Sequence, residues 1–468
     1  MARSEFVLRS AMPASAAGVF AWHARPAAFG RVQPPWENAA LTAVSGPFAD
    51  GQRLTIRASL LGPVGLNWVA EVFGVEPGRR FRDRQLSGPF AEWEHTHEFV
   101  PAGDSSSFLE DRVAYRLPLG FAGRVVGGGM VRDRLARMFA YRHAVTASDL
   151  RRHALYPQKL AVGITGSRGL IGSDVTAFLA AGGHTVVRFV RGTAEAGPGI
   201  DGTTQRPWSP DSPVDPKTLE GLDAVIHLAG DGIAEGRWTD AKKARIRDSR
   251  VGPTSHLAKA VAASFAATGR PHTFLCSSGI SSYGDTGDRV ADEDSPAGTG
   301  FLADVCKGWE GACDPARAAG VRVVNLRTGL VMSPKGGALA KQLPAFQAGG
   351  GAVLGNGNQW VSWITIGDAV GVIHHALMRP EVRGPVNMVS PNPVTNREFG
   401  RTLAKVLHRP FVLTLPASVL RVMFADLADE AMLASTRIAP KRLTETGFAF
   451  DHPELAGAVR FVLGRPAG

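Results

Sequence analysis

The feature that most constrains the fold is a set of three glycines, Gly166, Gly169 and Gly172, between two apolar segments. Residues 160–164 predict a buried parallel strand, and residues 170–179 predict the helix that it enters. The first glycine permits a tight turn, the second lets the backbone approach a pyrophosphate, and the third lets helix and strand pack closely. The spacing therefore predicts a dinucleotide site of Rossmann type, although it also occurs in plain strand–helix turns.

Two short segments are expected to contact the cofactor. Backbone N–H groups of the glycine loop and the helix dipole would face the phosphates. A later strand, residues 224–230, ends in small residues, as needed where a backbone passes close to a bound cofactor. His227 in that strand is expected to be a packed side chain. The predicted cofactor-binding residues are Gly166, Ser167, Arg168, Gly169, Leu170, Ile171, Gly172, Leu228, Ala229 and Gly230.

The end of the next strand bears on which cofactor is used. Residues 184–190 predict that strand, which ends in Arg191 and carries no closing acidic residue. An acidic side chain there would accept hydrogen bonds from the ribose hydroxyls of NAD, whereas a guanidinium suits the 2′-phosphate of NADP. Arg191, with Arg168 and Arg188 as helpers, predicts NADP(H). A solvated arginine at a strand end is the alternative.

Composition and length restrict the class of protein. A chain of 468 residues predicts two domains. The formal charge is +10, but the arginines are scattered and do not form a basic run with interleaved aromatics, which argues against nucleic acid. Cys276, Cys306 and Cys313 show neither metal-ligand spacing nor a disulfide framework, so we predict no metal site and a reducing cytoplasm. Glu5 and Arg9 interrupt the first residues, and no stretch suits a membrane span.

The first 150 residues follow a different pattern. A helix capped near Ser15 follows the first strand, and an amphipathic helix over residues 129–144 closes the region. Between them, alternating segments predict an antiparallel sheet. The expected strands are residues 6–10, 54–60, 66–73, 80–86, 92–99 and 107–115. This order of elements resembles the START-like helix-grip fold of polyketide cyclases and ligand-transport proteins, although no diagnostic motif accompanies it.

The helix-grip resemblance implies an N-terminal domain over residues 1–152 with an apolar cavity under the closing helix. A cavity of roughly 300–1,000 Å³ would hold a small apolar ligand. Trp36, Trp68, Trp93, His95 and His97 are candidates to line it, and the alternative for them is plain core. An interior filled by side chains, used as a docking or homodimer surface, is the competing interpretation. Residues 148–159 are expected to connect the domains.

The rest of the chain is similar to a specific family. The stretches that carry the similarity are residues 223–230, 237–239 with Lys243, 248–251, 301–306 with Trp309 and Glu310, 327–329, 336–339, 362–364 with Asp368, 393–396 and 440–450. They resemble the atypical extended short-chain dehydrogenases called epimerase-family or nucleoside-diphosphate-sugar epimerase proteins. The resemblance implies an α/β Rossmann domain over residues 159–468, with a doubly wound parallel sheet and a small substrate lobe after residue 327. Gln359 and Trp363 are the expected substrate-lining residues.

The chain departs from that family at its acid/base pair. Short-chain dehydrogenases usually place a Tyr and a Lys four residues apart on one helix face. Here Leu302 takes the Tyr position and Cys306 takes the Lys position. Lys307 would point about 100° away on the helix, toward solvent. Ser278 stands where the family places a hydroxyl against the substrate oxygen, and Tyr283 follows it in a loop, so these two are the predicted catalytic residues.

Three functions remain open on the sequence. The leading one is an NADP(H)-dependent oxidoreductase or epimerase that acts on a carbonyl or alcohol of a small molecule. The second is a non-catalytic NADPH-sensing module that has lost the acid/base pair. The third is a carrier that holds an apolar ligand in the N-terminal domain and presents it to the reductase part.

Overall fold

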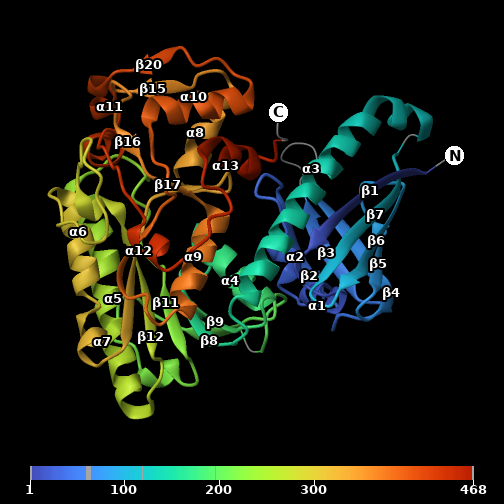
Figure 1. The fold of residues 1–468 in the computed structure, drawn as a ribbon, viewed down its shortest axis with the longest axis horizontal. Coiled ribbons are helices and arrows are strands. Elements are labelled where there is room, and N and C mark those ends of the chain that lie inside the picture. Colours follow the sequence, from blue (N-terminus) through green and yellow to red (C-terminus); the bar gives the residue numbers. More distant parts are fainter. Residues whose placement is uncertain (1–2, 59–64, 119, 196, 466–468) are drawn as a thin grey trace.

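The computed structural model describes residues 3–58, 65–118, 120–195 and 197–465. Two seven-stranded sheets lie side by side, one formed before residue 117 and the other after residue 160 (Figure 1). The first sheet is antiparallel throughout and the second is parallel throughout. The predicted Rossmann-like parallel sheet is therefore confirmed.

The antiparallel sheet has the strand order β1-β7-β6-β5-β4-β3-β2. Two short helices, α1 (Ala16–His23) and α2 (Ala28–Arg31), lie between the first two strands in sequence. Ser15 Oγ accepts a hydrogen bond from the Gly18 N–H at 3.2 Å and caps α1, as the sequence predicts. The strands are β1 (Ser4–Met12), β2 (Ala39–Val44), β3 (Arg53–Ala58), β4 (Leu66–Glu76), β5 (Arg80–Ser87), β6 (Glu92–Gly103) and β7 (Ser106–Arg116). The sequence analysis missed β2, and residues 59 and 60 of its expected strand 54–60 lie outside the described residues.

The closing helix α3 is longer than predicted. It runs over Gly120–Ala154, so residues 148–154 of the expected connection are helical, and the predicted end of the first domain at residue 152 lies within this helix. The last turns stay helical because their side chains have partners in the second half of the chain. Arg152 Nη2 donates to Asp368 Oδ1 at 2.8 Å and to Asp451 Oδ2 at 2.7 Å. The connection is therefore only the short segment after the helix.

The parallel sheet has the order β10-β9-β8-β11-β12-β13-β18, with helices on both faces. Helices α4 and α9 pack on one face, and α5, α6 and α7 pack on the other. This is the doubly wound arrangement that the sequence predicts. The strands are β8 (Ala161–Thr165), β9 (Thr185–Val190), β10 (Thr204–Pro207), β11 (Ala224–His227), β12 (Thr273–Gly279), β13 (Arg322–Thr328) and β18 (Gly384–Met388). The helices are α4 (Leu170–Ala181), α5 (Asp240–Thr268), α6 (Phe301–Gly311), α7 (Asp314–Ala318) and α9 (Ile366–Met378).

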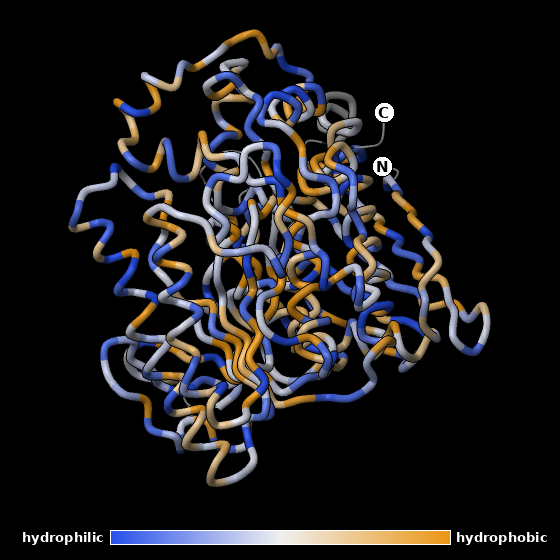
Figure 2. Tube along the Cα trace, turned by 60° about the vertical axis from the view of Figure 1, so that its left-hand side comes forward, coloured by the Kyte–Doolittle hydropathy of each residue, from blue (hydrophilic) through white to orange (hydrophobic). Residues whose placement is uncertain are grey.

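The parallel strands form the apolar centre of the molecule. Val162, Ile164, Val225, Ile226 and Leu275 are fully buried between the helices of the two faces. Figure 2 shows these strands as a bundle of hydrophobic tubes in the middle of the chain. Burial of apolar side chains on both faces is the main source of stability for such a sheet. His227, also fully buried, is a packed strand residue as predicted.

The C-terminal part forms a lobe around Trp363. Helices α8, α10 and α13 pack there with short strands into one apolar cluster. The helices are α8 (Gly337–Gln347), α10 (Asn396–Leu407), α11 (Ala417–Phe424), α12 (Lys441–Glu445) and α13 (Leu455–Val462). The strands are β14 (Leu330–Met332), β15 (Ala352–Leu354), β16 (Trp360–Val361), β17 (Trp363–Thr365), β19 (Val394–Thr395) and β20 (Leu413–Leu415), and the short helical turns are η1 (Pro216–Leu219), η2 (Ile280–Tyr283) and η3 (Ala428–Met432).

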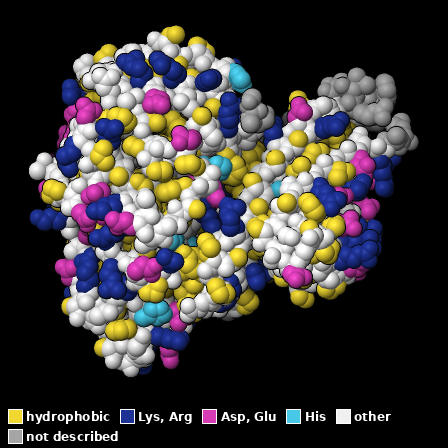
Figure 3. Space-filling model, in the orientation of Figure 1, with side chains coloured by type: hydrophobic (Ala, Val, Ile, Leu, Met, Phe, Trp, Pro, Cys, Tyr) yellow, Lys and Arg dark blue, Asp and Glu magenta, His cyan; other side chains and the backbone are white. Residues whose placement is uncertain are grey.

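Buried ion pairs help to join the two halves. Arg31 on α2 pairs with Asp149 on α3 at 2.7 Å and with Asp174 on α4 at 3.4 Å. Arg25 Nη1 donates to the Ala181 carbonyl at the end of α4. Acidic side chains lie among the lysines and arginines on the face shown in Figure 3. Within the described part of the chain, no helix combines the length and the apolar character that crossing a bilayer requires.

Candidate functional site

The glycine loop after β8 has the geometry that a dinucleotide phosphate needs. Gly166 has φ +67°, and a Cβ there would lie 2.7 Å from the Leu228 carbonyl carbon at the end of β11. A Cβ on Gly172 would lie 2.1 Å from the Gly166 carbonyl oxygen. Gly169 is exposed at the start of α4, where no side chain of the described residues caps the helix. The free N–H groups of the first turn can therefore bind an anion.

The loop and the end of β11 meet, as the sequence predicts for a shared cofactor surface. Leu228 and Ala229 are half-buried and Gly230 is exposed. Leu170 contacts the start of α8, because a Cβ at Gly336 would lie 3.6 Å from Leu170 Cδ1. Both helix N-termini, of α4 and α8, thus approach Leu170. The residues present fit a pyrophosphate between the loop and β11.

The three predicted arginines differ in their surroundings. Arg168 and Arg191 are exposed, at the glycine loop and just beyond the end of β9. Arg188, inside β9, pairs with Asp201 at 3.0 Å. Arg188 therefore already has a carboxylate partner, whereas the exposed position of Arg191 at the strand end leaves its guanidinium accessible from solvent.

Ser278 is held by the carboxylate of Glu310, a residue to which the sequence analysis assigned no role. It lies at the end of β12, is 4% exposed, and its Oγ donates to Glu310 Oε1 at 2.7 Å. Arg327, on β13, binds the same carboxylate through two bonds, Nε to Oε1 at 2.8 Å and Nη2 to Oε2 at 2.9 Å. Glu310 thus accepts from a hydroxyl and a guanidinium at once, and it fixes the direction of the Ser278 hydroxyl.

Tyr283 lies near this group but its phenol is engaged elsewhere. The side chain is 1% exposed, and its hydroxyl donates to Asn387 Oδ1 at 2.7 Å. The Arg327 guanidinium stands 4.8 Å from the centre of the phenol ring. Burial raises the pKa of Tyr283 to about 12 despite that cation. A neutral, hydrogen-bonded phenol here orients Arg327 and Asn387.

The positions of the usual acid/base pair are apolar. Leu302 is 4% exposed and packs in a cluster with Trp238 and Ile246. Cys306 is also buried, and burial raises the pKa of its thiol to about 11. Lys307 is exposed, as predicted. Neither residue of the replaced pair can transfer a proton as a Tyr–Lys pair does.

The two predicted substrate-lining residues have structural partners. Trp363 is fully buried in the C-terminal lobe, and its Nε1 donates to the Asn392 carbonyl at 3.0 Å. Gln359 is 8% exposed, and its Nε2 donates to the carbonyls of Leu354 and Met432 at 3.1 Å each. The structure brings neither of them to Ser278 through these contacts, and a substrate role for both stays a prediction.

Glu310 and Arg327 both lie in the stretches that carry the family resemblance, but their contact with Ser278 had only a weak signal in the sequence. Glu310 follows Cys306 by four residues, so it lies on the face of α6 that carries the replaced pair. Arg327 ends the strand next to β12 in the parallel sheet, with Ser278 directly opposite it in register. Helical spacing and strand order together point to this contact, but only once the strand order is known.

A separate cavity lies inside the N-terminal sheet, under helix α3. Its volume is about 890 Å³, within the range expected from the sequence. Trp68, Trp93, His95 and His97 line it, whereas Trp36 packs on the Tyr141 ring with centroids 5.0 Å apart. Most of its wall is apolar, from Phe29, Leu41, Phe48, Leu54, Phe81, Leu135 and Met138.

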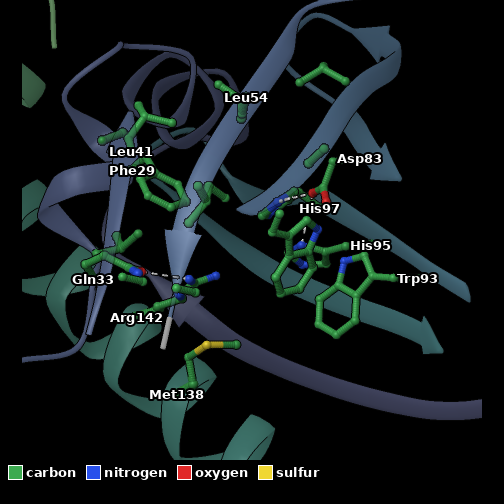
Figure 4. Close-up of a pocket in the computed structure, with 18 of the residues that line it drawn as sticks. Phe29, Gln33, Leu41, Leu54, Asp83, Trp93, His95, His97, Met138 and Arg142 are labelled. Carbon is green, nitrogen blue, oxygen red and sulfur yellow. Dashed lines mark hydrogen bonds and ion pairs between the residues drawn. The ribbon is translucent and has the colours of Figure 1, made fainter. Parts of the chain in front are cut away.

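The cavity also has a polar side (Figure 4). Arg142 donates to Gln33 Oε1 at 3.0 Å, and Asp83 lies beside the imidazoles of His95 and His97. Burial lowers the pKa of His95, but the Asp83 carboxylate outweighs it and raises that pKa to about 9. Burial likewise raises the pKa of Asp83, but the two imidazoles hold it below its usual range. Charged and ionisable side chains thus interrupt an otherwise apolar lining, to which Arg25, Glu37 and Arg134 also contribute.

A smaller cavity, about 310 Å³, connects this region to the phosphate loop. It shares Pro26, Leu41 and Ile200 with the large cavity. On its other side it is lined by Ser167 of the glycine loop and by Arg188 of β9. The large cavity therefore adjoins the β8 and β9 side of the parallel sheet, while Ser278 is on β12.

Comparisons with known proteins agree with this arrangement. The sequence profile of the NAD dependent epimerase/dehydratase family matches residues 162–389, and a domain of unknown function matches residues 415–462. An epimerase family protein of Mycobacterium bovis is 44% identical over 306 residues, which are 65% of this chain and 98% of that protein.

Two solved structures are similar over different lengths. A nucleoside-diphosphate sugar epimerase from Corynebacterium glutamicum is 32% identical with a TM-score of 0.79, and the match covers 98% of this chain and 90% of that one. The human epimerase family protein SDR39U1, solved with NADPH, is 30% identical with a TM-score of 0.57, over 65% of this chain and 99% of that one. The first similarity includes the N-terminal sheet, and the second covers about the length of the parallel-sheet part.

Proposed function

The chain belongs to the NAD-dependent epimerase/dehydratase family, and we propose that it is an NADP(H)-dependent oxidoreductase or epimerase-like protein for a small carbonyl or alcohol. The observation that carries the proposal is the glycine loop, whose Gly166 and Gly172 leave no room for side chains beside the uncapped start of α4. NADPH bound to a family member of 30% identity supports the choice of NADP(H). Arg191 is the proposed contact for the 2′-phosphate, since it is exposed at the end of β9.

Ser278 and Glu310 are the proposed proton path. When bound, a nicotinamide cofactor supplies hydride transfer. Because Ser278 donates its proton to Glu310, the Ser278 oxygen can accept a hydrogen bond from a substrate hydroxyl. During oxidation of the alcohol, the proton of the substrate hydroxyl would pass to Ser278 while Ser278 passes its own proton to Glu310. During reduction of the carbonyl, the two protons would move in the opposite direction. Arg327 and Tyr283 position the carboxylate.

We expect ordinary sugar-nucleotide epimerisation to be slow or absent. The missing Tyr–Lys pair removes a positioned acid/base that typically contributes about 10²–10⁴-fold. The test incubates the chain with UDP-glucose and NAD⁺ or NADP⁺ and follows UDP-galactose by chromatography. Fast conversion that survives both Ser278→Ala and Tyr283→Phe would show that another acid/base acts here.

A panel of carbonyl compounds with NADPH tests the proposed activity itself. Consumption of NADPH that depends on one class of carbonyl supports the oxidoreductase. Tight NADPH binding without turnover across the panel supports the second function, a sensing module, which the apolar side chains at positions 302 and 306 favour. Failure to bind NADPH rejects both.

For the N-terminal part we propose a START-like helix-grip domain that binds an apolar small molecule. Support comes from the order of its elements, β1-α1-α2 followed by six strands and α3, and from the cavity of about 890 Å³. The cavity adjoins the glycine-loop side of the parallel sheet, away from Ser278 on β12. This position favours a ligand held apart from the hydride-transfer site over one presented to it. Residues 159–468 are the proposed second domain.

An apolar fluorescent probe should bind this cavity with one equivalent. Met138 lines the cavity from α3, so Met138→Trp should fill part of it and weaken probe binding by about tenfold or more. Val7→Trp, at a 43% exposed position on β1, is the matched control. Equal probe affinity in the two variants would place the binding elsewhere.

A further inference from the structure

Two imidazoles, those of His95 and His97, lie beside the Asp83 carboxylate at the polar side of the N-terminal cavity (Figure 4), and a second carboxylate, Asp111, contacts the same imidazoles. His95 and His97 are two residues apart on β6, so both point to the same face of the sheet. Asp83 on β5 lies opposite His95 in register, and Asp111 on β7 lies opposite His97. Three neighbouring strands thus bring four chemically active side chains together.

One carboxylate determines where the imidazole protons lie. Asp111 Oδ1 is 3.1 Å from His95 Nε2 and 2.7 Å from His97 Nδ1. Its other oxygen is 2.7 Å from His143 Nε2, and His143 Nδ1 is 2.8 Å from Ser10 Oγ. We assign protons to the nitrogens that face Asp111, because a carboxylate only accepts hydrogen bonds; His95 Nε2 is aligned for such a bond, whereas His97 Nδ1 is close to Asp111 without that alignment. The lone pairs of His95 Nδ1 and His97 Nε2 are then directed away from Asp111.

Those two lone pairs face the second carboxylate. Asp83 Oδ2 lies 3.2 Å from His95 Nδ1 and 3.6 Å from His97 Nε2. Three acceptor atoms this close repel one another unless a cation lies among them. Without a metal ion, a second proton on His95 satisfies its contact with Asp83 and leaves the contact between His97 and Asp83 without a cation, and a metal ion would take the place of that proton. Ligands held about 2.0–2.2 Å from a tetrahedral metal ion stand about 3.3 Å apart, which matches both contacts.

We propose that Asp83, His95 and His97 bind a divalent first-row transition-metal ion, and that Asp111 orients the two imidazoles from behind. A carboxylate that hydrogen-bonds the far nitrogen of a ligating imidazole is the usual support of such a ligand. Two imidazoles and one carboxylate suit Zn²⁺, Fe²⁺ or Co²⁺. The set lies outside the parallel-sheet part, so the proposal does not depend on nicotinamide chemistry.

The open side of this metal site faces the large cavity. The side chains of Asp83 and His97 are 18% and 14% exposed, whereas those of His95 and Asp111 are each 4% exposed. All three proposed ligands line the cavity. A ligand in the cavity with an oxygen donor could therefore complete the coordination, and Arg142, which lines the same cavity, could balance an anionic group. The expected ligand class is an apolar molecule with an anionic or neutral oxygen donor.

A second group of histidines serves as the internal control. His153, His184 and His374 are buried together at the junction of α3, β9 and α9. His184 Nδ1 accepts the Leu160 N–H at 3.2 Å, so its proton must lie on Nε2 and no lone pair is left for a metal. This group is therefore expected not to bind the ion, although its residue types suit one.

The first experiment needs no variant. The full chain is stripped with a chelator and titrated with Co²⁺ by visible absorption and with Zn²⁺ by calorimetry, and one equivalent is expected. X-ray absorption of the Zn²⁺ form should show nitrogen and oxygen ligands at about 2.0–2.2 Å with outer-shell scattering from two imidazoles. No stoichiometric binding, or a shell of three imidazoles, overturns the proposal.

Variants locate the ion. His97→Gln should remove the Co²⁺ band, and Asp111→Asn should lower the affinity by about 10–100-fold. His374→Gln, in the control group, should leave both the band and the affinity unchanged. Loss of the band in His374→Gln with retention in His97→Gln contradicts the assignment. If His97→Gln does not fold, the imidazole count from X-ray absorption of the native chain decides the question.

Discussion

Replacing Asp149 by alanine is expected to lower the free energy of unfolding by about 3–5 kcal/mol. Asp149 is fully buried and Arg31 is 5% exposed, and two hydrogen bonds of 2.7 and 2.9 Å join them. Without the carboxylate, the guanidinium stays buried, and among the described residues Asp174, at 3.4 Å, is the one acidic side chain still paired with it. Because α2, α3 and α4 meet here, the loss should be seen in urea unfolding followed by circular dichroism.

A double variant separates lost attraction from the cost of the unpaired charge. Arg31→Met combined with Asp149→Leu replaces the pair by apolar side chains of similar volume, and such replacements are often neutral or stabilising. The double variant should therefore be more stable than Asp149→Ala alone. If Asp149→Ala alone lowers the free energy of unfolding by less than about 1 kcal/mol, the Arg31 guanidinium must reach water, either because water enters the site or because α2 moves.

The second large effect is expected at Ser278 and Glu310. Ser278→Ala and Glu310→Gln should each lower nicotinamide-dependent kcat/KM by about 10²–10⁴-fold while leaving the NADPH affinity unchanged. The first removes the hydroxyl, and the second replaces the carboxylate that accepts its proton at 2.7 Å. The rates are measured with the most active carbonyl of the panel, and the affinity by calorimetry.

Lys307→Gln is the matched control for this helix. Lys307 is exposed on α6, three residues before Glu310. We therefore expect Lys307→Gln to leave both kcat and the NADPH affinity unchanged. Normal turnover in Glu310→Gln would remove the carboxylate from the proton path. A parallel loss of NADPH binding would instead indicate that the network supports the fold of the cofactor site.

Local patterns in the sequence predict the glycine loop and its neighbouring elements well. Strand β8, helix α4 and strand β9 follow from apolar runs and from three glycines whose spacing has a direct steric meaning. The end of α3 could not be predicted in this way. Its last turn depends on Arg152 meeting Asp368, a residue 216 positions later in the chain. Such a contact leaves no trace in local periodicity.

The same limit applies to the sites. The sequence led to Ser278 because it ends a strand in a recognisable stretch, and its catalytic role stays a prediction; its partner Glu310 lies 32 residues later on a helix. The alternation of β6 correctly places His95 and His97 on one face. Their relation to Asp83 and Asp111 depends on strand register, which the sequence does not reveal. The spacing of the cysteines was the basis for predicting no metal site. It could not reveal the proposed site, because the proposed ligands are two imidazoles and a carboxylate.

Calorimetric titration with NADPH and NADH tests the central claim most directly. A charge-assisted contact between Arg191 and the 2′-phosphate should be worth roughly 1.5–3 kcal/mol, or about 10- to 150-fold in Kd. We expect NADPH to bind more tightly by that factor, Arg191→Ala to lose the preference, and Arg401→Ala, at an exposed position on α10, to keep it. Equal affinities in the native chain, or an unchanged preference in Arg191→Ala, would contradict the account.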